Sequence, residues 1–203
     1  EWGDRSPSTH GASVSLARGH RCRRSQRWAA ASVAGVALAY GWVAFAHLPA
    51  QAFYSGDMGP KYVQARSFLS EGFSSLTLPY PGALLDPTEQ FFPFAEPFVF
   101  RTAHGIQASS SPTSALVRAA FVAFGDIRGV TMLALLGAIV VLWLATRMAV
   151  DDEPRILSWV LGFGTCLWFY AVIPWEHAPA AALGMAGVWI GLNRHGWRWA
   201  VVA

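Results

Sequence analysis

Asp57 is the acidic residue that is best placed for chemistry in this sequence. Gly56 and Gly59 lie on either side of it, and a helical pattern begins at position 60 and runs to 72. A carboxylate on such a turn can accept a proton from a substrate hydroxyl or bind a cation. The structural alternative is that Asp57 caps the following helix, a favoured role for Asp, or pairs with Lys61.

A second group of candidate residues is Trp175-Glu176-His177, which directly precedes a short apolar run. Ionisable residues at the edge of a membrane helix are costly and are often functional. The alternative is interfacial anchoring, with the indole in the aromatic belt and the charged ends of Glu176 and His177 in water.

The composition predicts a membrane protein. Hydrophobic residues make up 54% of the chain and charged residues 13%, and mean hydropathy is +0.34. Soluble domains carry about 25% charged residues. The net charge is +3, but the arginines lie beside apolar runs, so the expected partner is the lipid bilayer and not nucleic acid. The predicted fold class is an all-α membrane protein, a multi-pass helical bundle.

Four apolar runs are expected to cross the membrane, and a fifth begins near the last residue. They are 28–48, 129–150, 156–175 and 176–192, with 197–203 as the start of the fifth. A hydrocarbon core of about 30 Å needs about 20 such residues. The first run could also be a cleaved signal peptide, because Ala-Phe-Ala at 44–46 is similar to a cleavage site, but the long polar segment before it disfavours this.

The arginines orient these runs through the positive-inside rule. Six lie in 1–27, five of them in 18–27 next to the first run, and this segment is interpreted as a disordered, basic cytoplasmic tail. Others flank the connections 147–155 and 193–198, whereas 174–177 has neither Lys nor Arg. The N-terminus is therefore predicted to be cytoplasmic and the segment 49–128 to be extracytoplasmic.

The long outer segment 49–128 is expected to contain two short amphipathic helices. One covers 60–72 and has Gly72 as its C-cap, and the other covers 111–124. The aromatic stretch 91–100 is expected to lie at the bilayer interface or against the helices. The orientation also puts Asp57 on the same outer face as Glu176 and His177, which predicts one shared site.

The arrangement resembles the N-terminal part of the GT-C membrane glycosyltransferases, the superfamily of the dolichyl-phosphate-mannose–protein mannosyltransferases and the bacterial aminoarabinose transferase. The resemblance covers about 28–198 and is carried by the segments 54–62, 125–126 and 169–177. Protein mannosyltransferases have a second acid at the position of Met58, so the resemblance does not imply a protein acceptor.

This resemblance implies sugar transfer from a polyprenyl-phosphate donor to an unidentified extracytoplasmic acceptor, at a bacterial plasma membrane, with inversion. Asp57 would be the general base. Lys61 and Arg66 would supply positive charge near the phosphate leaving group. Glu176 and His177 would hold acceptor, donor or, together with Asp57, a possible divalent metal ion.

Two other functions stay open from the sequence, namely a transporter segment and a non-catalytic polytopic membrane scaffold. Charges inside membrane helices mark ion pathways. The middles of the four apolar runs are uncharged, which disfavours a transporter.

Overall fold

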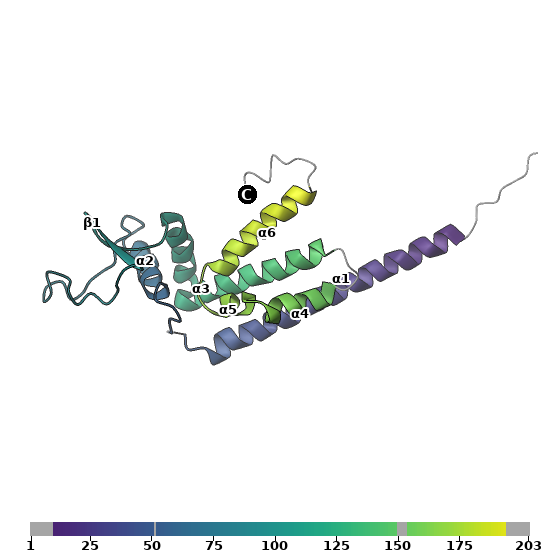
Figure 1. The fold of residues 1–203 in the computed structure, drawn as a ribbon, viewed down its shortest axis with the longest axis horizontal. Helices are drawn as coiled ribbons and strands as arrows, with labels where there is room; N and C mark the ends of the chain where they lie inside the picture. Colours follow the sequence, from purple (N-terminus) through teal and green to yellow (C-terminus); the bar gives the residue numbers. More distant parts are fainter. Residues whose placement is uncertain (1–9, 51, 150–153, 194–203) are drawn as a thin grey trace, which may run out of the picture.

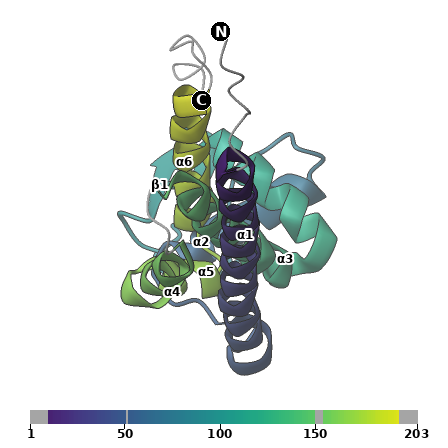
Figure 2. The same ribbon diagram turned by 90° about the vertical axis from the view of Figure 1, so that its right-hand side faces the viewer.

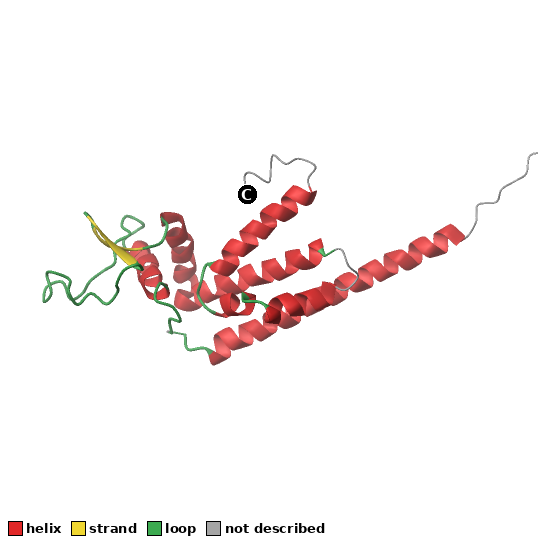
Figure 3. Cartoon of the chain, viewed as in Figure 1, coloured by secondary structure: helices red, strands yellow, loops and turns green. Residues whose placement is uncertain are grey.

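The computed structural model describes residues 10–50, 52–149 and 154–193. The described chain is mostly helical, and two short strands lie at one end of the molecule (Figure 3). The prediction of an all-α chain is corrected by these strands, which lie in the long segment between the two longest helices.

The first helix is longer than the apolar run that it contains. Helix α1 spans His10–Trp42 and continues into a π-helical turn, η1, Val43–His47. Residues 10–27 are therefore helical and not a disordered tail, while residues 1–9 lie outside the described part. No proline interrupts α1, and each further residue adds one hydrogen bond once a helix has been nucleated. The N-terminal end of α1 extends beyond the other helices (Figure 1).

Within the described residues, two helical segments are long and apolar enough to cross a membrane, Gln26–His47 and Pro112–Met148. The predicted run 156–175 is not one continuous helix. It forms α4, Pro154–Gly164, and α5, Leu167–Val172.

The break between α4 and α5 has a local cause in the side chain of Thr165. Its hydroxyl donates to the Leu161 carbonyl at 2.6 Å and accepts from the Leu167 amide at 3.2 Å. A threonine hydroxyl that bonds to nearby backbone groups competes with the helical hydrogen bonds. The last described helix, α6, is His177–Asn193, close to the predicted run 176–192.

Helix α3, Pro112–Met148, consists of two helical parts that meet at a break. Ser111 caps its start and accepts a hydrogen bond from the Ser114 amide at 3.2 Å. The backbone leaves helical geometry at Gly125 and Asp126, where the sequence predicted that the helix 111–124 would end. The second part covers most of the predicted run 129–150, whose last residue lies outside the described part.

The helix predicted over 60–72 is α2, Met58–Ser70. Gly72 follows it with a φ of 62°. The Gly72 amide donates to Leu69 and the Phe73 amide to Phe68, and the two phenylalanine rings pack edge to face at 5.1 Å. These bonds and the ring contact form the Schellman end of a helix, in which glycine supplies the left-handed residue.

The strands β1, Val99–Thr102, and β2, Gly105–Ala108, form an antiparallel hairpin with Val99 opposite Ala108. The hairpin has a small apolar core of its own, in which Phe92 and Phe94 pack beside Val99 and Ile106. These rings thus pack within the outer segment, whereas Phe91 is exposed.

The helices pack around α3, which contacts α1, α2, α4, α5 and α6. In Figure 2, α1 runs from top to bottom in front, and the other helices lie beside and behind it. Helix α6 approaches α3 closely at Gly137, where an added Cβ would lie 2.5 Å from the backbone of Pro179. This contact sets the start of α6, and with it the position of Glu176, beside α3.

Candidate functional site

The carboxylate of Asp57 is held by three side chains. Ser55 donates to Oδ1, the Lys61 ammonium lies 2.5 Å from Oδ2, and the Trp175 indole donates to Oδ2 at 3.2 Å. Asp57 precedes α2, but its side chain makes no capping hydrogen bond. The capping interpretation is therefore wrong, and pairing with Lys61 is what the structure contains.

Lys61 joins Asp57 to Glu176. Its Nζ lies 2.5 Å from Oδ2 of Asp57 and 2.5 Å from Oε1 of Glu176. Because both oxygens lie 2.5 Å from one nitrogen, they are at most about 5 Å apart. The two acids are separated by more than one hundred positions in the chain, and the fold brings them to one ammonium group.

The fourth charged residue is Arg118, from the first part of α3, which the sequence analysis did not single out. Its Nη2 donates to Oε2 of Glu176 at 3.0 Å, and its side chain is only 6% exposed. The buried positions Ala115, Ala119 and Val122 mark the inner face of this helix. Arg118 lies on that face, and an arginine within a buried helical stripe is the signal that could have identified it.

These four residues, Asp57, Lys61, Arg118 and Glu176, are called the charged cluster below. Burial raises the pKa of the Asp57 carboxyl, but the hydrogen bonds from Lys61, Ser55 and Trp175 lower it by more, so that the net pKa lies below its ordinary value. Burial likewise raises the pKa of Glu176, but its hydrogen bond from Lys61 and the charge of Arg118 bring it below its ordinary value. Both acids are therefore ionised at neutral pH.

Two glycines allow the outer segment to cover the Asp57 turn. A Cβ on Gly56 would lie 2.5 Å from the ring of Phe98, and one on Gly59 would lie 3.2 Å from the ring of Phe94. These phenylalanines thus pack over the turn that carries Asp57. The buried Gln64 side chain adds a polar connection, because it accepts from Ser110 at 2.5 Å and donates to the Leu76 carbonyl at 3.0 Å.

The connection between α5 and α6 positions Trp175 and Glu176. The chain is extended at Ile173, and Pro174 follows. Helix α6 then begins at His177, and the Glu176 carbonyl accepts the Ala180 amide at 2.9 Å. Glu176 therefore lies at the end of α6 that faces α2, with its side chain 37% exposed.

Two predicted site residues lie outside the charged cluster. Arg66 is exposed on α2 and contacts the Tyr62 hydroxyl at 3.4 Å, and that hydroxyl in turn donates to Asp126. His177 is exposed and stacks on the ring of Tyr170, with centroids 4.6 Å apart. Arg118, and not Arg66, is thus the second cation beside Glu176.

The proposed metal ligands Asp57, Glu176 and His177 are not gathered around one point. Across the described ranges, no three His, Cys, Asp or Glu side chains lie close enough together to bind a metal ion. The Lys61 ammonium lies between the two carboxylates, where a bridging divalent cation would otherwise bind them.

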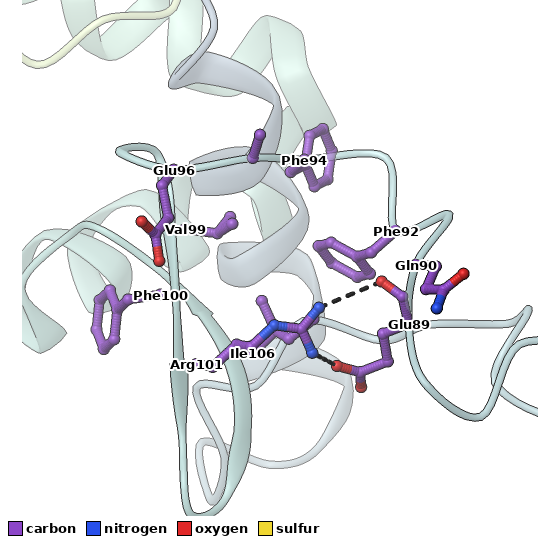
Figure 4. A pocket seen from close by; sticks show the side chains of 10 residues that line it. Glu89, Gln90, Phe92, Phe94, Glu96, Val99, Phe100, Arg101 and Ile106 are labelled. Carbon is purple, nitrogen blue, oxygen red and sulfur yellow. Dashed lines mark hydrogen bonds and ion pairs between the residues drawn. The ribbon is translucent and has the colours of Figure 1, made fainter.

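A separate cavity of about 260 Å³ lies beside the β-hairpin, and no residue of the charged cluster lines it. Its lining combines Phe92, Val99 and Ile106 with Arg101 and Glu89 (Figure 4). The Arg101 guanidinium bonds to the Glu89 carboxylate and, at 3.2 Å, to the Glu89 carbonyl. These bonds connect the hairpin to the preceding loop, so the pair has a structural role.

Comparison of this chain with protein-family models, with curated proteins and with solved structures finds no match.

Proposed function

We propose that this chain belongs to a multi-pass membrane glycosyltransferase that transfers a sugar from a polyprenyl-phosphate donor to an extracytoplasmic acceptor. The observation that carries the proposal is the charged cluster, in which two ionised carboxylates and two cations meet beside the ends of apolar helices. Burying four charges there is costly, and charges in such positions are commonly functional.

The residues of the cluster fit the two halves of a glycosyl transfer. The Asp57 carboxylate would accept the proton of the acceptor hydroxyl while its oxygen bonds to the anomeric carbon. The bond from that carbon to the phosphate oxygen would break on the opposite face, which inverts the anomeric configuration. The leaving phosphate would keep the electron pair, and Lys61 and Arg118 would stabilise its charge.

The membrane arrangement is part of the same proposal. In it, α1 with η1, the second part of α3, α4 with α5, and α6 cross the bilayer, and α2 and the hairpin lie outside the cytoplasm. Support comes from the two long apolar helices and from the arginines beside the connections, which the positive-inside rule places in the cytoplasm.

The test is turnover of a polyprenyl-phosphate sugar by the chain in detergent micelles, followed by release of polyprenyl phosphate. Asp57→Asn should lower the rate by about 10²- to 10⁴-fold, the range for loss of a general base. Glu71→Gln changes an acid that directly follows the last residue of α2 and is the matched control. A rate for Asp57→Asn equal to that of the unsubstituted chain would remove Asp57 from the chemistry.

A second candidate function is a membrane scaffold in which the ion pairs of the charged cluster only hold the helices together. The observation that favours it is that each carboxylate oxygen of Asp57 and Glu176 already has a partner. These ion pairs would connect α2, α3 and the start of α6. In that case Asp57→Asn would lower stability, and the chain would release no polyprenyl phosphate in the turnover assay.

A further inference from the structure

The guanidinium of Arg118 has a nitrogen without a partner. Nη2 donates to Glu176 and, at 3.4 Å, to the Ser114 hydroxyl. Nη1 is buried and has no hydrogen-bond partner among the described residues. A buried donor on a charged group is costly to leave unpaired, so this nitrogen points to a ligand with further acceptor oxygens.

The Glu176 carboxylate lies where such a ligand would meet both cations. Its two oxygens bridge Lys61 Nζ at 2.5 Å and Arg118 Nη2 at 3.0 Å. A phosphoryl group has three oxygens in place of two, and arginine matches phosphate geometry well. It could keep both contacts and supply the acceptor that Nη1 lacks.

Charge balance decides how an anion could enter. The cluster contains two carboxylates and two cations, so an added anion would be repelled while Glu176 stays in place. Glu176 is also the member best able to move, because its side chain is 37% exposed whereas those of Lys61 and Arg118 are 11% and 6% exposed.

We propose that a phosphate-class anion binds between Lys61 and Arg118 by displacing the Glu176 carboxylate. Glu176 thus holds the two cations in place until the ligand arrives, and the ligand must compete with it. This inference deepens the proposed function, because it assigns Glu176 a place-holding role at the phosphate position of that same site.

The experiment measures dissociation constants by calorimetry for the chain in detergent micelles, with inorganic phosphate and, separately, with polyprenyl phosphate. Glu176→Gln should tighten binding by about tenfold to a hundredfold, because one negative charge next to the bound anion is removed. Arg118→Gln should weaken binding at least tenfold. Arg128→Gln removes the same charge from an exposed position of α3 and should leave the constant unchanged.

The inference is supported if, for either ligand, Glu176→Gln binds more tightly and Arg118→Gln binds more weakly than the unsubstituted chain. The ligand with the lower dissociation constant then identifies the source as free phosphate or as the lipid-linked phosphate. Unchanged or weaker binding by Glu176→Gln for both ligands overturns it. If Arg118→Gln fails to fold, Arg118→Lys keeps the charge with fewer donors and should give intermediate affinity. This experiment measures binding, whereas the Asp57→Asn test measures turnover. A negative binding result would therefore not decide the proposed function.

Discussion

Lys61→Met is the substitution that tests the charged cluster most directly. The Lys61 ammonium is the group that separates the Asp57 and Glu176 carboxylates, and its side chain is 11% exposed. Methionine keeps the apolar length of the side chain and removes the charge and all three donors. The substitution leaves two carboxylate oxygens facing each other within about 5 Å.

The expected loss of stability follows from the burial of the partners. Breaking a buried ion pair by removing one partner costs about 3 to 5 kcal/mol. The Glu176 side chain is 37% exposed and Arg118 still neutralises it, so the lower end, about 3 kcal/mol, is expected. That loss corresponds to about a hundredfold fall in the ratio of folded to unfolded chain.

The assay is reversible unfolding in mixed micelles, with the free energy of unfolding obtained from the denaturant dependence. Arg66→Met removes a cation from an exposed position of the same helix and should change stability by less than about 0.5 kcal/mol. Adding Glu176→Gln to Lys61→Met should recover part of the loss, because one of the facing charges is removed. A loss below about 1 kcal/mol for Lys61→Met would refute the reasoning.

Three further outcomes are expected. The pKa values of Asp57 and Glu176 are lowered on folding, so the stability that these carboxylates contribute is fully present above their ordinary pKa values and is lost as the pH falls through the lowered values of the folded chain. Unfolding curves recorded at decreasing pH check this. A loss of stability that begins above about pH 6 would contradict it. Gly72→Ala should lower the free energy of unfolding by about 1 kcal/mol, because alanine is strained at a φ of 62° although its Cβ would meet nothing within 4 Å. An unchanged free energy of unfolding would argue against the left-handed end of α2. Gly137→Ala should destabilise the fold by about 1 to 3 kcal/mol, because the added Cβ would clash with the α6 backbone. Gly184→Ala should be neutral or slightly stabilising, because its added Cβ would meet nothing within 4 Å. Equal effects of the two substitutions would contradict the close packing of α3 on α6.

Local signals located the helices and several of their ends. Ser111-Pro112 indicated the start of α3, Gly125 its break and Gly72 the end of α2, and each effect depends on the residue itself or on its near neighbours. The division of 156–175 was not predicted, because hydropathy does not register the hydrogen bonds of one threonine hydroxyl. The hairpin was not predicted, because its two strands have only four residues each and show no clear alternation of apolar and polar residues.

The sequence by itself determined that the chain is rich in apolar helix and that Asp57 lies on a glycine-flanked turn before α2, because periodicity and backbone preference are local properties. It also favoured one face for Asp57 and Glu176 through the distribution of arginines. Only the tertiary structure decided that Lys61 joins these two acids and that Arg118, 58 positions from Glu176 in the chain, completes the cluster. The physical reason is that ion pairing depends on distances of a few ångströms, which are set by the packing of α3 on α2 and α6.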